Sequence, residues 1–124
     1  MKYTTKIQRS KSVCLPLKIR KDIESNELNK VEWVLDNNKN TIQLNFTKKE
    51  ETPQDVYSEN MTKLYRNIYQ STIIKIPNTV FNILKCQIFD NILIEEKDNA
   101  IFITTSKKTE IAEISALIKK SGDE

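Results

Sequence analysis

The sequence predicts a mainly β fold with short helices, in which two copies of one unit share a core and an amphipathic helix follows them. Two stretches match without a gap at a spacing of 57 residues, and apolar runs of strand length recur in both. Each copy also ends in two apolar runs that flank a turn rich in Asn and Asp. A unit of about 45 to 55 residues is near the size at which a lone core is marginal, so we expect the copies to pack together.

The match between the copies rests on basic and apolar positions. The identical pairs at this spacing are Lys6/Lys63, Arg9/Arg66, Lys18/Lys75 and Ile19/Ile76. Apolar character is kept at Ile7/Leu64, Leu17/Ile74 and Ile23/Val80. We therefore divide the chain into a first repeat at 1–47, a linker at 48–60, a second repeat at 61–105, and a C-terminal helix and tail at 106–124.

The first repeat begins with a weakly alternating segment and a polar loop. Its predicted elements are a strand over Thr4–Gln8, a loop over Arg9–Ser12, a strand over Val13–Ile19, a helix over Lys21–Glu27, and a hairpin of Val31–Leu35 with Thr41–Phe46. Pro16 restricts the second strand to an edge or a bulge, because proline cannot donate to a ladder. Lys18 lies between two apolar residues of that strand and is expected to face solvent.

The linker and the second repeat carry helix-start signals. Thr52-Pro53-Gln54-Asp55 predicts a short helix, since it offers an N-cap, a proline at the first helical position and an acid in the first turn. Pro77 follows a residue biased to extended backbone and predicts a helix from Asn78 to about Lys85. The predicted strands of this repeat are Lys63–Arg66, Ile73–Ile76, Ile92–Ile94 and Ala100–Thr104.

The segment from Lys107 to Lys120 predicts an amphipathic helix. One face would carry the apolar residues Ile111, Ile114, Leu117 and Ile118. This face either packs on the protein's own sheet or pairs with another chain, which would make the helix a self-association surface.

The positive charge is concentrated although the net charge is only +3. The stretch 1–21 contains seven Lys or Arg and no acid, and the stretch 60–89 contains four and no acid. Lysines at strand edges can also serve only to prevent edge-to-edge aggregation. The exclusion of acids from both repeats favours phosphate binding.

The composition disfavours an enzyme and predicts no cofactor or metal site. There is no histidine and one glycine, so the usual acid-base groups and a phosphate-cradling glycine loop are missing. Two cysteines at unrelated positions are expected to be buried free thiols. The turn that begins at Asp36 opens like a calcium loop, but Thr41 and Thr47 stand where that loop needs Gly and Glu.

No segment suggests a membrane or an export route. None of the apolar runs approaches the roughly 20 residues of a membrane span. The first residues contain no apolar h-region, so a cytoplasmic location is expected.

The order of strand, basic loop, strand, short helix and hairpin resembles the AbrB/MazE/SpoVT swapped-hairpin DNA-binding family. Ile74-Lys75-Ile76-Pro77-Asn78-Thr79-Val80 is similar to the family motif usually written Val-Thr-Ile-Pro-Lys-Glu-Ile, and Asp90 falls at the Asp of the family's Gly-Asp turn. Phe89 stands at the Gly of that turn, Arg20 stands where the first repeat would have the proline, and the first helix is about four residues short.

The resemblance implies a tandem swapped-hairpin barrel, an intramolecular pseudo-dimer in one chain. It also implies a transcriptional regulator whose two basic loops grip double-stranded DNA. In the MazE branch the contacts correspond to Arg66 and Lys75 here, and by the repeat spacing to Arg9 and Lys18. The full candidate set of DNA-binding residues is Lys6, Arg9, Lys11, Lys18, Arg20, Lys63, Arg66 and Lys75.

Two other functions remain open at this point. One is a protein–protein interaction or scaffold module that uses the barrel and the C-terminal helix without DNA. The other, within the same family, is an antitoxin-like component.

Overall fold

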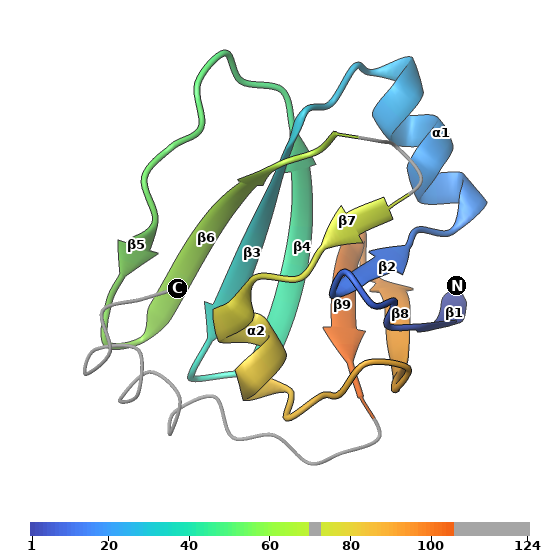
Figure 1. The fold of residues 1–124 in the computed structure, drawn as a ribbon. Coiled ribbons are helices and arrows are strands. Elements are labelled where there is room, and N and C mark those ends of the chain that lie inside the picture. The colour runs from blue at the N-terminus through green and yellow to red at the C-terminus, as the bar shows by residue number, and fades with distance from the viewer. Residues whose placement is uncertain (70–72, 106–124) are drawn as a thin grey trace.

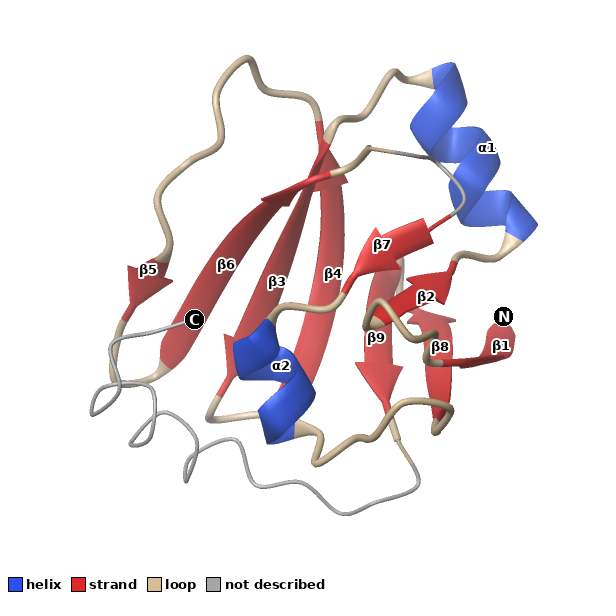
Figure 2. Cartoon of the chain, viewed as in Figure 1, coloured by secondary structure: helices blue, strands red, loops and turns tan. Residues whose placement is uncertain are grey.

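Antiparallel β-structure dominates the computed structural model, which describes residues 1–69 and 73–105 (Figure 1). In these residues a seven-stranded sheet has the order β1-β8-β9-β4-β3-β6-β5, and β2 pairs with β7 in a separate ribbon. The ribbon and α2 lie across one face of the sheet (Figure 2). The predicted mainly β class with short helices is confirmed, whereas the helix predicted over Lys107–Lys120 lies outside the described residues.

The first half of the chain contributes β1 (Lys2–Lys6), β2 (Ser12–Cys14), α1 (Leu17–Ser25), β3 (Lys30–Asp36) and β4 (Thr41–Thr47). The segment between the halves contains β5 (Val56–Tyr57). The second half contributes β6 (Met61–Asn67), β7 (Ile73–Lys75), α2 (Asn78–Ile83), β8 (Asn91–Lys97) and β9 (Ala100–Thr104). Neither described helix is long and apolar enough to cross a membrane.

The two halves exchange strands. The first strand of the first half, β1, pairs with β8 of the second half, and β6 of the second half pairs with β3 of the first. The ribbon joins β2 to β7, and β4 meets β9 at the centre of the sheet. Most of the strand pairing therefore crosses between the halves, as expected for two units that share one core.

The predicted repeat spacing of 57 residues is wrong by four. Lys6 pairs with Asn91, and Lys30 pairs with Asn67. Lys6 and Asn67 are 61 residues apart, and so are Lys30 and Asn91, so a shift of 61 residues converts one pair into the other. The helices follow the same spacing, because Pro16 precedes α1 as Pro77 precedes α2. The identities of basic residues at 57 are therefore not structural equivalences.

The strand predicted over Val13–Ile19 is confirmed only at its start, because β2 ends at Cys14. Pro16 is the N-cap of α1, with φ −66° and ψ 154°, and the helix starts directly after it. Leu17 is 57% exposed on the first turn, whereas Ile19 and Ile23 are buried at helical spacing. In the first repeat the proline before the helix is thus Pro16, and not a residue at the position of Arg20. Arg20 lies one turn into the helix.

The linker contains no helix at the predicted position. Asp55 instead accepts the backbone N–H of Tyr65 at 2.9 Å, which draws the linker along β6 and leads into the two-residue strand β5. In the second half, α2 ends at Ile83, two residues before the predicted end. Just after the helix, Lys85 takes a left-handed φ of 51°, and the Cys86 N–H bonds back to the carbonyl of Phe81 in the helix.

One core lies between the sheet and the elements on its face. It includes residues of both halves, among them Ile7, Val13, Leu15, Trp33, Leu44, Leu64, Ile76, Val80 and Ile94. Trp33 is fully buried, and its indole N–H has no hydrogen-bond partner in the described structure. Neither cysteine forms a disulfide, and Cys14 is half-buried, whereas Cys86 is buried as expected.

Candidate functional site

A tight turn presents Arg9 at the junction of β1 and β2. Lys11 donates its N–H to the Gln8 carbonyl at 2.9 Å, and Gln8 donates to the Ser12 carbonyl at 2.8 Å. Lys11 takes a left-handed φ of 59°, which closes the loop as a turn followed by a bulge. Arg9 therefore lies exposed at the tip of a turn that is fixed by its own backbone.

Lys75 of the second half lies beside this turn. It pairs in register with Ser12, and the next pair, Val13 with Ile74, is buried. Because side chains alternate along a strand, Lys75 lies on the side of the ribbon opposite to Ile74 and is exposed, whereas Ser12 beside it is buried. Lys75 also borders, with Ser10 and Ser12, a hollow of about 220 Å³.

Lys11 connects the turn to the start of α2. Its ammonium donates to Asn78 Oδ1 at 3.2 Å and lies 5.0 Å from the centre of the Phe81 ring. Asn78 and Lys75 line a second hollow, of about 380 Å³. We call Arg9, Lys11 and Lys75 the basic ribbon surface, because the β2–β7 ribbon brings them together from the two halves.

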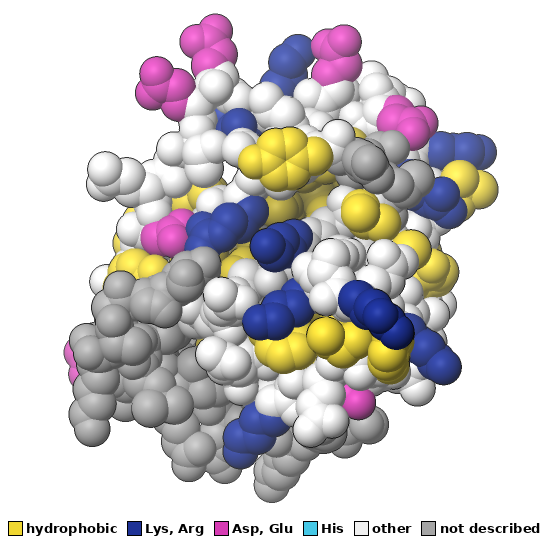
Figure 3. Space-filling view, in the orientation of Figure 1, with side chains coloured by type: hydrophobic (Ala, Val, Ile, Leu, Met, Phe, Trp, Pro, Cys, Tyr) yellow, Lys and Arg dark blue, Asp and Glu magenta, His cyan; other side chains and the backbone are white. Residues whose placement is uncertain are grey.

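The basic ribbon surface retains its positive charge. In residues 1–69 and 73–105, none of its three side chains forms an ion pair with a carboxylate. Figure 3 shows Lys and Arg side chains across the middle of this face, with hydrophobic side chains below them and most of the visible acidic ones along the upper edge. Several cations on one surface attract an extended anion that carries more than one negative charge.

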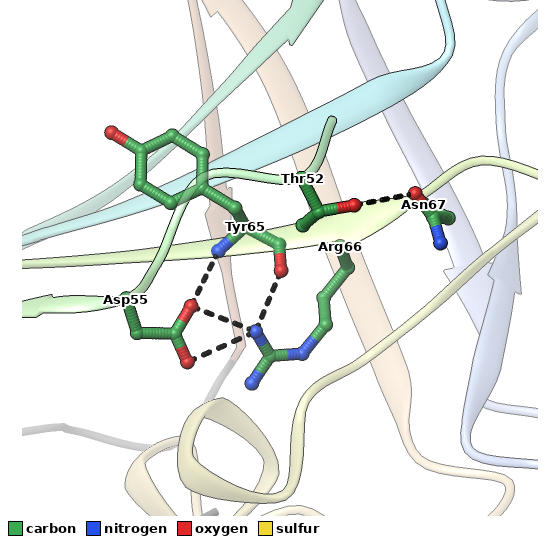
Figure 4. Close-up of polar contacts among 5 residues, drawn as sticks. All are labelled: Thr52, Asp55, Tyr65, Arg66 and Asn67. Atoms are coloured by element: carbon green, nitrogen blue, oxygen red, sulfur yellow. Dashed lines mark hydrogen bonds and ion pairs between the residues drawn. The ribbon is translucent and has the colours of Figure 1, made fainter. Parts of the chain in front are cut away.

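Arg66 differs from the other predicted contacts because a carboxylate holds it. Its Nη1 lies 2.9 Å and 3.1 Å from the two carboxylate oxygens of Asp55, and it also donates to the Tyr65 carbonyl at 2.7 Å (Figure 4). Both charged side chains are less than a third exposed. Arg66 lines the larger hollow with Lys75, but Asp55 offsets its charge.

Lys18 and Arg20 lie on α1 and not on the ribbon. The Lys18 ammonium forms an ion pair and a hydrogen bond with Glu96 of β8. Arg20 is half-buried, and its Nε is buried without a hydrogen-bond partner among the described residues. The structure therefore separates both residues from the predicted basic loop.

Lys6 and Lys63 point away from the ribbon. Each alternates with a buried neighbour, Ile7 for Lys6 and Leu64 for Lys63, so each side chain lies on the side of its strand that faces away from the core. Neither lines the hollows beside Lys75. Of the eight predicted contacts, Arg9, Lys11 and Lys75 form the basic ribbon surface, and Arg66 shares the larger hollow with Lys75.

The outer face of the sheet near Lys63 carries a polar cluster. Burial raises the pKa of Glu32, but hydrogen bonds from Asn45 and Tyr65, together with the nearby Lys63 charge, lower it below its ordinary value of 4.5 overall. The hydrogen bond to Glu32, followed by burial, raises the pKa of Tyr65 to about 12. This cluster joins β3, β4 and β6 and stabilises the sheet from outside the core.

Sequence reasoning missed the aromatic residues beside the basic ribbon surface. Phe81 lies against Lys11, and Phe89 lies 5.9 Å from the Arg9 guanidinium carbon. The one available signal was Phe89 in a position where the turn pattern calls for Gly. Asn78, which holds Lys11, gave no signal because its role depends on the ribbon pairing.

The described residues contain no group of three or more Cys, Asp or Glu side chains placed to hold a metal ion. Comparison of the chain with protein-family models, with curated proteins and with solved structures finds no match. The functional argument therefore rests on the geometry of the basic ribbon surface.

Proposed function

We propose that this chain is a DNA-binding transcriptional regulator that holds double-stranded DNA through the basic ribbon surface. One observation carries the proposal. The β2–β7 ribbon places Lys75 of the second half beside the turn that carries Arg9 and Lys11 of the first, and none of the three has a carboxylate partner among the described residues. Phosphates of a duplex would supply the missing negative charges.

The strand exchange supports an AbrB-like swapped-hairpin arrangement for this function. Each half sends its first strand into the sheet of the other, through β1–β8 and β6–β3. Pro16 and Pro77 each precede a helix that follows a ribbon strand, so both halves have the order expected of the family. We infer that one chain carries the two units that the family normally takes from two chains.

The expected contacts are mainly to the DNA backbone. Lys75 lines both hollows, and Lys11 bonds to Asn78, which lines the larger one. Both ammonium groups suit phosphate oxygens, which fix the position of the protein on the duplex. Arg9 at the turn tip also has the reach and the donor geometry for a guanine edge.

A salt titration tests the proposal. A labelled duplex of random sequence is titrated with the full chain by fluorescence anisotropy at several salt concentrations. Three phosphate contacts predict a slope of about −2.7 for the logarithm of affinity against the logarithm of salt, a fall of about 40-fold between about 50 and 200 mM. The triple variant Arg9→Ala, Lys11→Ala and Lys75→Ala should lose nearly all of this dependence.

The matched control is Lys39→Ala, which removes one exposed lysine from the β3–β4 turn outside the basic ribbon surface. Its slope should equal that of the unmodified chain. If the unmodified chain shows no salt-dependent binding, or if the triple variant binds equally well, the proposal is wrong.

A protein-interaction module is the second candidate, and the edge of the sheet favours it. Val56 and Tyr57 of the edge strand β5 are 50% and 43% exposed, so a partner strand could pair there. This reading would be supported if the chain does not bind DNA but retains an added protein partner.

A further inference from the structure

The Gln87–Asp90 segment, which we call the aromatic turn, has a backbone that favours glycine. Asp90 donates its N–H to the Gln87 carbonyl at 3.0 Å, and Phe89 at the third position has a φ of 75°. This is the pattern of a type II turn, in which the third residue is normally Gly or Asn. A bulky residue in the left-handed region is strained, so its side chain needs a reason to be there.

Burial in the core is not that reason. Phe89 is 58% exposed, and its neighbour Ile88 is 39% exposed. At the 61-residue spacing Phe89 aligns with Leu28, but Leu28 belongs to the end of α1, because its N–H bonds to the Ile23 carbonyl, and it packs against the core. The exposed aromatic ring at this turn is therefore a feature of the second half.

The aromatic turn is fixed beside the basic ribbon surface. Phe89 donates its N–H to the Ile7 carbonyl at 2.7 Å, and Ile7 donates to the Asp90 carbonyl at 2.9 Å. The Arg9 guanidinium carbon lies 5.9 Å from the centre of the Phe89 ring. An exposed ring next to cations suits a partner that combines negative charge with flat apolar faces, which are the properties of stacked bases between phosphates.

We propose that the aromatic turn inserts Phe89 as a wedge between two base pairs of the DNA that the basic ribbon surface holds. This inference rests on the proposed function and adds a second kind of contact to it. The backbone hydrogen bonds between Ile7 and the aromatic turn fix the backbone of Phe89, so little is lost in ordering the turn on binding. Insertion of an apolar side chain unstacks the step and bends the duplex.

The test compares a fully paired duplex with one that contains a single mismatched pair. Unstacking a mismatched step costs less, so the unmodified chain should bind the mismatched duplex about tenfold more tightly. Phe89→Gly should abolish this preference and weaken binding to the mismatched duplex about fivefold or more, because base–aromatic stacking is lost. The salt slope should stay unchanged, since no phosphate contact is removed.

Three measurements separate a wedge from a structural role. The melting temperature of Phe89→Gly should not fall, because glycine adopts a φ of 75° without a clash. Phe89→Tyr keeps a flat ring and should retain the mismatch preference. Leu17→Ala removes a side chain of nearly equal exposure, 57%, on α1 and should leave DNA binding unchanged.

Each contrary result has a distinct meaning. If Phe89→Gly keeps the affinity and the mismatch preference, the wedge is wrong and DNA binding by the basic ribbon surface stands. A lower melting temperature in that variant would show that the ring packs for stability, and a changed mass in solution would show a contact between copies; both overturn the wedge. If the unmodified chain shows no salt-dependent binding to either duplex, the proposed function fails first.

Discussion

Replacing Asp55 by Asn should strengthen DNA binding although it removes a hydrogen-bonded ion pair. In the folded protein the Asp55 carboxylate lies 2.9 Å and 3.1 Å from Nη1 of Arg66, and Arg66 borders the same hollow as Lys75. Asparagine keeps the shape of the side chain and can still accept the Tyr65 N–H. The change therefore leaves the Arg66 charge beside the basic ribbon surface and removes the Asp55 carboxylate that offsets it.

The size of the effect follows from charge counting. Three contacts give a salt slope of about −2.7, and one further neutralised phosphate gives about −3.6. Between about 50 and 200 mM salt the affinity of Asp55→Asn should fall about 150-fold, against about 40-fold for the unmodified chain. Because the pair is partly buried and charge-assisted, the same variant should lose about 1 to 2 kcal/mol of unfolding free energy.

Anisotropy titrations supply the slope, and urea unfolding followed by the fluorescence of the buried Trp33 supplies the stability. Arg66→Ala is the matched variant, since it breaks the same pair but removes the cation. It should lose similar stability and leave the slope near −2.7. Equal slopes in all three proteins would refute the assignment of Arg66 to the edge of the DNA site.

Four further predictions concern stability and assembly. Glu32→Gln should flatten the loss of stability in acid, because the lowered pKa of Glu32 stabilises the fold above about pH 4.5 and this contribution disappears as pH falls through the lowered value. At the other extreme, the raised pKa of Tyr65 stabilises the fold below pH 10, and urea unfolding at rising pH should show that contribution lost as the pH approaches about 12. Lys18→Ala should change the unfolding free energy by less than about 1 kcal/mol and leave the salt slope unchanged, because Lys18 is already paired with an acid at the surface. Residues 1–52 and 53–124 expressed separately should each lack a cooperative unfolding transition by circular dichroism, and a folded monomer of either would contradict the shared core.

The sequence revealed the repetition but misplaced its spacing, and the reason lies in which residues were compared. The match at 57 combined identical surface residues, such as Lys18 and Lys75, with apolar pairs such as Ile23/Val80, whose members are buried. The spacing of 61 also aligns buried residues, among them Val13 with Ile74, and in addition it aligns Pro16 with Pro77 before the two helices. Apolar character fits both spacings, so the two prolines were the stronger guide.

The predicted strand through Pro16 failed for a related reason. Val13, Leu15, Leu17 and Ile19 alternate as a strand would, but Leu17 is exposed, and the helical pair Ile19 and Ile23 sets the true period. Proline at the junction favours either an edge strand or a helix start, and only the tertiary contacts decide between them.

The candidate site was predictable only in part. Basic residues in acid-free stretches indicated the turn that carries Arg9 and the strand end that carries Lys75. The pairing of Arg66 with Asp55 could not be predicted, because Asp55 reaches it through the return of the linker along β6. The exposure of Phe89 likewise depends on a turn whose hydrogen bonds come from a distant part of the chain.

The tether between the halves changes how the fold responds to dilution. Strands that interleave between two separate chains come apart at low concentration, because their association is bimolecular. Here β1–β8 and β3–β6 close within one molecule, and residues 48–60 keep the halves at an effective concentration in the millimolar range typical of short linkers. The protein should remain assembled even when a cell holds only a few copies. Its two halves are also free to diverge independently. The second half exposes Phe89, whereas Leu28 of the first half packs against the core.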